Sequence, residues 1–521
     1  MKGREESDGR EQPQGRRKAV VTVKRRGGKA TTASEQARQL GMFSETADSP
    51  KGDDAGADAG LPASAPRAVP KSGNRKGRVP PAMTMEEVAN HNNLRRAFER
   101  VASNDGAPGP DKQSVEEVEK RLETLLPQLS RALLEGSYQP GMIRRVWIPK
   151  PGGGQRGLGI PDVVDRLVQQ AVYQVLSPHY EPTFHPSSHG FRPGRSCHTA
   201  IAEAKKHLEE GYTWVVDLDL EKFFDRVNHQ RLLSRLEQRV KDRRLLQLIG
   251  KMLKAKVVMP DGVVVSTEEG TPQGGPLSPL LSNIVLDELD HELARRNHRF
   301  VRYADDCNIY VRSERAGQRV MASVVRFIEG RLRLKVNAAK SAVAQPEGRH
   351  FLGFRLWREP REGTVEVLLS KRSKERIGEK IRELTPRNWG RSLKDCIHRL
   401  NAYLLGWIGF FRICTGGEAR KLAYLDAHIR RRLRALLLKQ WKRKRHMARR
   451  LIRLGVKPKT AWRGIYKEHR SWWALSHCPA VDRGLRNAYF ADRALVSLVE
   501  RWREYQSRRV VAPAQMTLSL G

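Results

Sequence analysis

The sequence has few cysteines and lacks any C-x-x-C pair. Its 521 residues include five cysteines, at positions 197, 307, 396, 414 and 478. This spacing excludes the common zinc-ribbon sites and indicates a reducing compartment. Long apolar runs are also missing, because the longest stretch, around residues 402–411, has about ten residues where a membrane span needs roughly 20. We therefore expect no membrane-spanning segment.

Aromatic and acidic residues are scarce as well. Aromatic residues make up 7% of the chain, and 58 Asp and Glu stand against 97 Lys and Arg, which gives a formal net charge of +39. The basic N-terminus has no apolar core of the kind that a secretory signal needs, so a cytoplasmic location is expected. A charge this far from zero predicts a polyanionic partner, either nucleic acid or an anionic membrane surface.

The excess charge is concentrated in the last part of the chain. Residues 1–80 contain one aromatic residue, Phe43, among many small and charged residues, which predicts a disordered basic tail. Residues 81–370 carry 43 basic and 37 acidic residues, whereas residues 371–521 carry 37 basic and 11 acidic residues. This concentration favours a surface that binds a phosphate backbone; a set of solvated helix faces is the alternative.

The hydrophobic pattern predicts an α+β domain followed by a helical region. From about residue 373 the chain reads as almost entirely helical, and its earlier part mixes both periodicities. In that earlier part the pattern predicts helices over residues 118–134, 162–176, 198–209 and 231–253, and strands over residues 142–149, 214–220, 256–259, 300–303, 307–311 and 349–356.

Two acidic pairs mark a candidate metal site. Asp305 and Asp306 stand between two apolar strand-like runs, and adjacent carboxylates repel each other unless a cation lies between them. Asp217 and Asp219 share one face of the strand over residues 214–220 because side chains alternate along a strand. Carboxylate oxygens are the ligands that Mg²⁺ prefers, so the two pairs could hold two Mg²⁺ ions for nucleotide transfer. Acids that cap turns on an ordinary sheet are the alternative.

Three further segments fit nucleotide transfer. Phe223 and Phe224 follow the acidic strand and could line a sugar pocket, although such residues often belong to the core. Residues 270–279 form a Gly- and Pro-rich loop before an apolar helix, where the backbone can approach a ligand or simply make a turn. Lys150 and Arg156 flank a glycine turn between two strand-like runs, and could bind a triphosphate or belong to an unremarkable surface hairpin.

In their chain order these segments resemble the reverse transcriptases encoded by bacterial group II introns. The resemblance covers roughly residues 90–510 and includes an upstream piece at residues 106–111. The last part of the chain is similar to the DNA-binding segment of class C enzymes. The Cys-paired HNH endonuclease domain with which longer members end is not found in this sequence. The resemblance rests on seven pieces: Lys150 with Arg156, His189–Ser196, Asp219–Asp225, Thr271–Pro279, Tyr303–Asp306, Asn337–Ser341 and Phe351–Phe354.

The resemblance implies roles for single residues. Asp219, Asp305 and Asp306 correspond to the catalytic, metal-binding acids and would hold two Mg²⁺ ions. Asp219 is preferred to Asp217 because the family's acid precedes the paired aromatics by four and five residues. Phe224 corresponds to the aromatic that excludes a ribose 2′-hydroxyl. The implied dNTP-binding residues are Lys150, Arg156, Phe224, Gln273 and Lys340.

The resemblance also implies an architecture. It predicts a right-hand polymerase, with fingers and a palm built on an antiparallel sheet, over residues 81–370. An all-helical thumb or maturase (X) domain would follow over residues 371–455, then a small helical DNA-binding segment over 456–510 and a tail over 511–521. The predicted nucleic-acid-binding residues are Arg430, Arg431, Arg432, Arg434, Lys442, Arg443, Lys444 and Arg445.

The function implied by the resemblance is RNA-directed DNA polymerisation. The protein would bind group II intron RNA to assist splicing, and would use an RNA template, a DNA primer, dNTPs and target DNA during retrohoming, associated with the bacterial nucleoid and not with a membrane. Two alternatives stay open. One is a maturase-type RNA-binding protein without polymerase activity, and the other is a domesticated or defence reverse transcriptase.

Overall fold

The computed structural model describes residues 82–149, 154–271, 273–386, 390, 392–467 and 471–517, with side chains up to residue 508. The predicted tail over residues 1–80 lies outside this range, and so does Lys150. At the other end the last helix reaches Thr517, within the predicted tail over residues 511–521. In the part of the chain described here, no helix is long and apolar enough to span a membrane.

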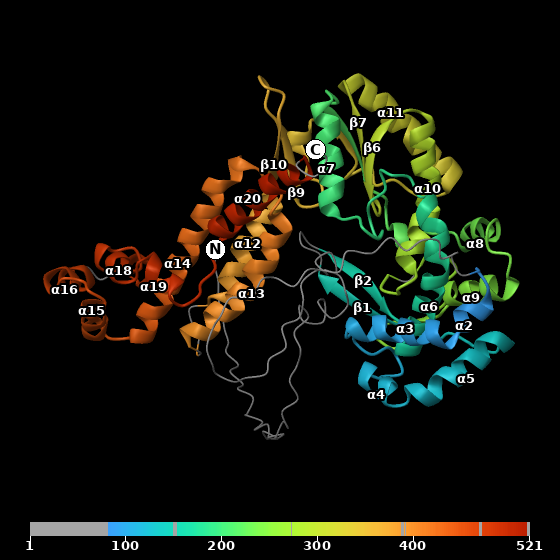
Figure 1. The fold of residues 1–521 in the computed structure, drawn as a ribbon, viewed down its shortest axis with the longest axis horizontal. Coiled ribbons are helices and arrows are strands. Elements are labelled where there is room, and N and C mark those ends of the chain that lie inside the picture. The colour runs from blue at the N-terminus through green and yellow to red at the C-terminus, as the bar shows by residue number, and fades with distance from the viewer. Residues whose placement is uncertain are drawn as a thin grey trace, which may run out of the picture.

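The protein is a mixed α and β molecule whose strands all precede a long helical region (Figure 1). The helices of the first part are α2 (Met85–Ala89), α3 (His91–Ser103), α4 (Val115–Lys120), α5 (Leu122–Glu135), α6 (Val163–Tyr180), α7 (Cys197–Glu209), α8 (His229–Glu237), α9 (Arg243–Leu253), α10 (Ser278–Arg295) and α11 (Glu314–Phe327). The helical region contains α12 (Lys371–Leu384), α13 (Leu393–Phe411), α14 (Ala419–Trp441), α15 (Lys444–Arg453), α16 (Pro458–Tyr466), α17 (Trp472–Leu475), α18 (Pro479–Gly484), α19 (Asn487–Ala491) and α20 (Leu498–Thr517).

In the described residues, ten strands form three sheets. The first has the order β2-β1-β4-β5, the second pairs β10 with β9, and the third has the order β6-β7-β3-β8. In the third sheet β3 pairs antiparallel with both β7 and β8, and β6 pairs antiparallel with β7. The strands are β1 (Ile143–Pro149), β2 (Gln155–Ile160), β3 (Trp214–Leu218), β4 (Val257–Val258), β5 (Val264–Val265), β6 (Arg299–Tyr303), β7 (Asp306–Val311), β8 (Ala342–Ala344), β9 (Phe354–Arg358) and β10 (Val365–Leu369).

Two apolar cores cover the two faces of the third sheet. Alternate side chains of a strand point to opposite faces, so Val216 and Leu218 of β3 enter the core shared with helices α2–α6 and α8–α11. Val215 of the same strand and Tyr310 of β7 enter a second core, which continues through β9, β10 and α7 into the helices α12–α20. The third sheet therefore joins the N-terminal helices to the helical region.

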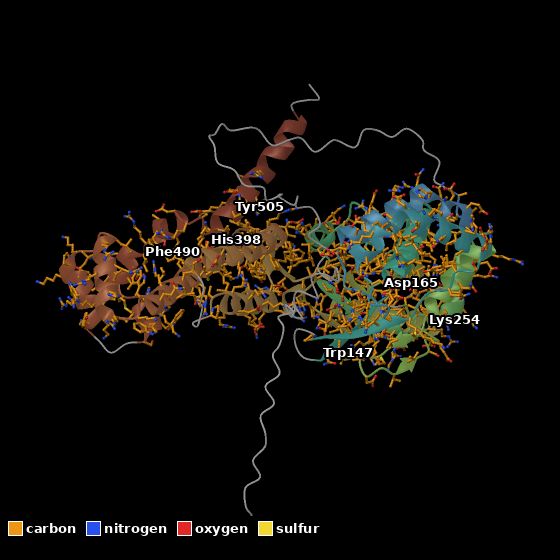
Figure 2. The ribbon with its side chains drawn as sticks, turned by 90° about the horizontal axis from the view of Figure 1, so that it is seen from below. Trp147, Asp165, Lys254, His398, Phe490 and Tyr505 are labelled. Carbon is orange, nitrogen blue, oxygen red and sulfur yellow. The ribbon has the colours of Figure 1, made fainter. Side chains whose placement is uncertain are left out.

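The last helix, α20, packs back against the helices that precede the end of the chain. The carboxylate of Asp426 on α14 accepts hydrogen bonds from the backbone N–H groups of Leu498 and Val499, at 2.9 and 3.2 Å, and so caps the first turn of α20. Trp502 Nε1 donates to the carbonyl of Cys414 at 2.9 Å. Tyr505 lies farther along the same helix (Figure 2). The described residues between 456 and 508 thus share one core with helices α12–α15 instead of forming a core of their own.

Three predicted elements differ from the structure. The predicted helix over residues 118–134 is divided at Arg121 into α4 and α5. The predicted helix over residues 231–253 is divided into α8 and α9, because Asp242 accepts the backbone N–H of Arg244 at 2.8 Å and caps a new helix start. The predicted strand over residues 349–356 begins only at Phe354, since Leu352 and Gly353 have φ values of +52° and +86° and form a turn. In each case a local turn interrupts a continuous apolar pattern.

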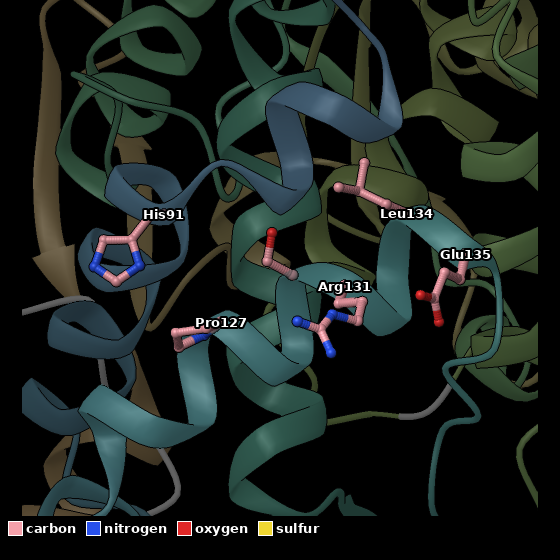
Figure 3. Close-up of a pocket in the computed structure, with 6 residues that line it drawn as sticks. His91, Pro127, Arg131, Leu134 and Glu135 are labelled. Atoms are coloured by element: carbon pink, nitrogen blue, oxygen red, sulfur yellow. The ribbon is translucent and has the colours of Figure 1, made fainter.

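A shallow hollow of about 540 Å³ lies on the outer side of the N-terminal helices (Figure 3). It is formed by α3 and α5, which lie at the opposite end of this lobe from β6 and β7 (Figure 1). Its lining combines an imidazole, a proline ring and a few polar and charged groups: His91, Pro127, Ser130, Arg131, Leu134 and Glu135. None of the predicted site residues lines it, so this hollow is not the candidate active site.

A cluster of carboxylates joins the loop before α4 to the start of α6. Asp162 accepts the backbone N–H of Asp111 at 3.1 Å, and the buried carboxylate of Asp165 (Figure 2) accepts the backbone N–H of Gly141 at 3.0 Å. Desolvation, together with repulsion from Asp111 and Asp165, raises the pKa of Asp162 to about 6. The folded protein therefore binds a proton at Asp162 more tightly than the unfolded chain, whose aspartates keep a pKa near 3.9.

Removal of this charge is expected to stabilise the protein above about pH 6 but not at pH 4. The wild type loses stability as the pH rises from about 4 to about 6 and stays at that lower level above it, because the ionised Asp162 is disfavoured in the fold. We expect Asp162→Asn to raise the free energy of unfolding by about 1 kcal/mol at pH 8, after allowance for solvent screening, and to have no such effect at pH 4. Urea unfolding at both pH values measures this, and equal effects at both would contradict it. Asp261→Asn, in an exposed hairpin turn, is the matched control.

Candidate active site

The predicted catalytic acids meet at one edge of the third sheet. β3 and β7 run antiparallel with Leu218 opposite Cys307, so the end of β3 lies beside the start of β7. Asp219 follows Leu218 directly, and Asp306 is the first residue of β7. The antiparallel pairing therefore brings Asp219 to the same edge as Asp305 and Asp306, although they are far apart in the sequence.

A two-residue turn carries the acidic pair. Tyr303 and Asp306 are paired across β6 and β7, which leaves Ala304 and Asp305 as the connection. Ala304 has a φ of +55°, in the left-handed region that normally takes glycine at the first position of such a hairpin turn. This conformation costs about 1 kcal/mol for a residue with a Cβ, so surrounding contacts must hold the turn in place.

The neighbouring acids Asp217 and Asp219 have different partners. Arg349 donates from Nε to Asp217 at 2.8 Å, so Asp217 is part of an ion pair within the protein. Lys340 Nζ lies 3.2 Å and 3.3 Å from the two carboxylate oxygens of Asp219. The side chain of Asp219 remains at the sheet edge, next to the acidic turn. That Asp219, and not Asp217, is the metal ligand stays a prediction. The ion pair between Asp217 and Arg349 supports it.

The carboxylates of the turn are held in a strongly unfavourable electrostatic environment. Desolvation, followed by repulsion from Asp305, Asp219 and Asp217, raises the pKa of Asp306 to about 7. This happens although part of the Asp306 side chain stays open to solvent at the rim of the sheet. Desolvation also raises the pKa of Asp305, which the positive charge of Arg156 partly opposes. A cation between these groups would remove the repulsion.

The chemistry of the three acids fits Mg²⁺, but their side chains are not yet arranged as a metal cage. Among the described residues, no three His, Cys, Asp or Glu side chains stand close enough together to hold a metal ion. The carboxylate of Asp219 is instead directed to the ammonium group of Lys340. Mutual repulsion among Asp219, Asp305 and Asp306 is the observation that fits a divalent cation, and Mg²⁺ would have to displace Lys340 from Asp219.

Gln273 lies on a loop that is held against β2. Its backbone carbonyl accepts the N–H of Gly159 at 2.7 Å. The next residue, Gly274, has a φ of +124°, and a Cβ there would lie 2.4 Å from the carbonyl oxygen of Gly159, so only glycine fits. Arg156 is exposed on the same strand, β2, and its charge acts on Asp305. The loop, β2 and the acidic turn therefore surround one region of the surface, while Lys150 lies outside the described residues.

Phe224 is half-buried beside this region, whereas Phe223 is buried in the core. The two rings contact each other edge to face at 5.2 Å. The backbone carbonyl of Phe224 accepts the N–H of Thr271 at 2.6 Å. Gly270, with a φ of +94°, leaves no room for a Cβ against the same carbonyl, at 2.8 Å. The Gly-rich loop thus fixes the backbone that carries Phe224.

Comparison with known proteins identifies the family of this fold and site. Residues 148–356 match the family described as Reverse transcriptase (RNA-dependent DNA polymerase), and residues 374–455 match the Group II intron, maturase-specific domain. The chain is also similar to Protein YkfC of Escherichia coli (strain K12), at 36% identity over 317 residues that cover 53% of this chain and 83% of YkfC. The chain belongs to the group II intron reverse transcriptase and maturase family.

Intron-encoded relatives share a smaller part of this reverse transcriptase and maturase. Group II intron-encoded protein LtrA of Lactococcus lactis subsp. cremoris is 41% identical over 181 residues, which cover 34% of this chain and 30% of LtrA. An uncharacterized 91 kDa protein in the cob intron of Schizosaccharomyces pombe is 38% identical over 180 residues, which cover 34% of this chain and 21% of that protein. These matches support the reverse transcriptase domain, and they cover too little of either relative to carry over the roles of the whole protein.

The four predicted nucleic-acid-binding arginines of α14 do not share one face of the maturase-region helix. Arg434 is buried and donates from Nε to the carbonyl of Leu485 at 2.9 Å, and it pairs with Asp482. Arg432 donates to the carbonyl of Thr385 at 2.7 Å. The guanidinium groups of Arg432 and Arg434 are thus bonded to protein partners, and their binding to nucleic acid stays a prediction.

Two other arginines of α14 are half-buried, namely Arg430 and Arg431. The guanidinium of Arg431 lies 4.2 Å from the ring centre of Trp473 on α17, a cation–π contact that joins the two helices. The side chains of Lys442 and Arg443, on the turn between α14 and α15, are exposed, and so is that of Arg445 in the first turn of α15. Of the predicted basic residues, these last three have the most surface open to a phosphate backbone.

Lys444 begins α15 next to an aromatic pair. Its ammonium lies 5.6 Å from the ring centre of Tyr466, and the rings of Trp462 and Tyr466 lie 5.6 Å apart on α16. Tyr466 is 50% exposed and Trp462 36% exposed, so both rings present surface to solvent. Exposed aromatics beside cationic side chains are suited to stacking on bases, which extends the predicted basic surface onto α16.

Sequence reasoning missed the residues beneath the acidic turn. Arg302 of β6 is 1% exposed and forms an ion pair of 2.6 Å with Asp290 of α10, which is 0% exposed. Neither residue was a candidate, because Arg302 is a single charge in an apolar strand and Asp290 is one of several acidic residues on α10. The available signal was the charge itself, since an arginine between Val301 and Tyr303 in a buried strand requires a partner.

Proposed function

We propose that this protein is an RNA-directed DNA polymerase encoded by a group II intron, which also binds the intron RNA and assists its splicing. The observation that carries the proposal is the meeting of Asp219, Asp305 and Asp306 at one edge of a sheet within the matched reverse transcriptase domain. An RNA-binding protein without polymerase activity would have no need for three carboxylates that destabilise one another.

In this proposal the molecule works as a right-hand polymerase. Residues 81–370 form fingers and palm, and the palm carries the third sheet. Residues 371–455 form the thumb or maturase domain, which includes the residues matched to the maturase-specific domain. Residues 456–510 bind target DNA through the exposed aromatics of α16 and the neighbouring basic residues. In this assignment the excess positive charge of residues 371–521 binds the phosphate backbone of the nucleic acid.

The residues of the site perform separate tasks in the proposed reaction. Asp219, Asp305 and Asp306 would bind two Mg²⁺ ions, which when bound supply positive charge for activating the primer 3′-hydroxyl and for stabilising the pyrophosphate. In this proposal Arg156 and Lys150 bind the triphosphate and hold the α-phosphate in line with the primer.

Three further residues select and complete the reaction in this proposal. Phe224 excludes a ribose 2′-hydroxyl by steric contact and so selects dNTPs. Gln273 contacts the incoming nucleotide and the template strand. Lys340, when released from Asp219, protonates the leaving pyrophosphate. Each of these side chains therefore acts on substrate, and catalysis depends mainly on positioning and charge stabilisation.

The proposed biological role joins splicing to DNA synthesis. The exposed basic residues at 442, 443 and 445, with Lys444, bind folded intron RNA and stabilise its structure, while splicing chemistry stays with the RNA. During retrohoming the same protein binds target DNA and copies the intron from an RNA template and a DNA primer. Such work places the protein in the bacterial cytoplasm and at the nucleoid.

The test is primer extension on an RNA template with dNTPs and Mg²⁺, together with a splicing assay on the intron RNA that flanks the gene. We expect synthesis that requires both dNTPs and Mg²⁺, and faster splicing when the protein is present. Intron RNA binding without synthesis would favour a maturase without polymerase activity. Synthesis without any effect on splicing would favour a domesticated or defence reverse transcriptase.

A further inference from the structure

We propose that Arg302 is a positioning residue that holds the acidic turn in the conformation in which Asp305 and Asp306 bind metal, acting together with Asp290, Asn283 and Ser188. This inference rests on the proposed polymerase function. The four residues come from three separate parts of the chain, namely β6, α10 and the segment before α7. They meet directly beneath the turn.

Every donor of the Arg302 guanidinium is used. Nε donates to Asp290 Oδ1 at 2.7 Å, and Nη2 donates to Asp290 Oδ2 at 2.6 Å and to Ser188 Oγ at 2.7 Å. Nη1 donates to Asn283 Oδ1 at 3.1 Å and to the backbone carbonyl of Ala304 at 2.8 Å. A guanidinium has five N–H donors, so this network is complete, and one of its bonds ends on the turn itself.

The bond to Ala304 acts on the strained residue of the turn. Ala304 has a φ of +55° and directly precedes Asp305. The guanidinium of Arg302 is oriented by its bidentate contact with Asp290. Through its hydrogen bond it in turn fixes the direction of the Ala304 carbonyl. Because the peptide unit is planar, the direction of this carbonyl also sets the direction of the N–H of Asp305. Arg302 therefore controls the backbone from which the carboxylate of Asp305 projects.

A second support reaches the turn from the segment before α7. The N–H of Arg302 donates to the carbonyl of Ser187 at 2.9 Å, and the N–H of His189 donates to the carbonyl of Arg302 at 2.8 Å. Gly190 then lies so close to the turn that a Cβ would be 2.3 Å from the backbone nitrogen of Ala304. Asn283 Nδ2 donates to the carbonyl of Gly190 at 2.9 Å. Asn283 thus connects both supports.

Stability alone does not account for this network. A buried ion pair is often no more stable than an apolar pair of similar volume, because both charges must be desolvated. An apolar pair would fill the same space, but it could not donate a hydrogen bond to the carbonyl of Ala304. The property that requires the guanidinium is therefore the orientation of the turn.

The test separates folding from positioning with two kinds of variant. Arg302→Lys keeps the charge. A lysine has fewer donors than an arginine, and their geometry does not allow bonds to both Asp290 and Ala304. The double variant Arg302→Met with Asp290→Leu removes both charges and keeps the core apolar. We expect both full-length proteins to bind intron RNA, and the double variant to unfold at a urea concentration close to that of the wild type.

The expected result is a loss of kcat with an unchanged substrate affinity. Both variants should lower kcat for primer extension roughly 100-fold, the size expected from misplaced reacting groups, while KM for dNTP stays within about twofold. Without substrate, the affinity for Mn²⁺ measured by electron paramagnetic resonance should fall about tenfold. Glu288→Gln is the matched control, because Glu288 also lies on α10 and pairs with Arg235 and Arg331 away from the turn.

Other results would overturn the inference. If the stable double variant kept the kcat and the Mn²⁺ affinity of the wild type, the network would be structural only. If Glu288→Gln lowered kcat as strongly as Arg302→Lys, the loss of any ion pair on α10 would explain the effect. A failure of the proposed polymerase function would look different from a failure of this inference. In the first case the wild type itself would show no primer extension, and the Mn²⁺ affinities of the wild type and the variants would still test the role of Arg302.

Discussion

Alanine at Asp306 is expected to lower the rate of RNA-templated DNA synthesis at least a thousandfold, or about 4 kcal/mol of transition-state stabilisation, while intron RNA binding stays within about twofold of the wild type. The carboxylate of Asp306 lies at the acidic turn and is repelled by Asp305 and Asp219. Its negative charge is therefore unfavourable in the free protein, and becomes favourable only when a cation is bound. Its removal relieves that repulsion and leaves the fold intact.

Single-turnover primer extension and filter binding of intron RNA measure the two effects in the same protein preparation. Asp217→Asn is the matched control, because Asp217 lies on the neighbouring strand but is paired with Arg349. We expect this control to keep synthesis within about tenfold of the wild type. If Asp306→Ala still synthesised DNA at an appreciable rate, or if a folded Asp306→Ala protein lost RNA binding, the separation of metal site and RNA-binding surface would be wrong.

Valine at Phe224 is expected to raise the incorporation of rNTP relative to dNTP by about 10- to 100-fold. Overpacking a filled site costs about 1–3 kcal/mol, and each 1.4 kcal/mol corresponds to a factor of ten. The backbone of Phe224 is fixed by the 2.6 Å bond from Thr271 N to Phe224 O and by the close approach of Gly270, so a shift of the backbone cannot carry the half-buried ring away from a 2′-hydroxyl.

Competition between one rNTP and its matching dNTP measures this selectivity as a ratio of kcat/KM values. Phe223→Val is the control, because Phe223 is buried in the core beside the same loop and should affect stability without a change in sugar selectivity. An unchanged ratio in Phe224→Val, or an equal change in Phe223→Val, would contradict the role of Phe224.

The sequence predicted that Asp219 would lie near Asp305 and Asp306. It did not predict the pairing of Arg302 with Asp290 beneath the acidic turn. Alternation along β3 and the turn between β6 and β7 are local properties, so the meeting of Asp219 with the acidic turn followed from strand patterns and from the order of the motifs. The pairing of Arg302 with Asp290 depends on a contact between β6 and α10 that no local pattern records. Short strands such as β8, with three residues, and β5, with two, were also missed, because so few residues give no periodicity.

The arginines of α14 illustrate a second limit. Consecutive residues of a helix point about 100° apart, so Arg430, Arg431 and Arg432 cannot share one face. Arg434 lies on the side of α14 that contacts Asp482, and it is buried there. Composition correctly predicted a basic helix, but only the packing of α14 against its neighbours shows which charges remain open to solvent.

The capping of α20 by Asp426 has a consequence for protein synthesis. The groups that bond to Asp426 follow it by 71 to 73 residues, and they lie at Ser497, Leu498 and Val499, at the start of α20. Until that helix has emerged, the apolar faces of α13 and α14 that it covers remain exposed on the nascent chain, a state prone to aggregation. A ribosome that stalls before residue 498 would hold α13 and α14 without the helix that covers them. The core of the helical region is therefore completed only after α20 has been synthesised.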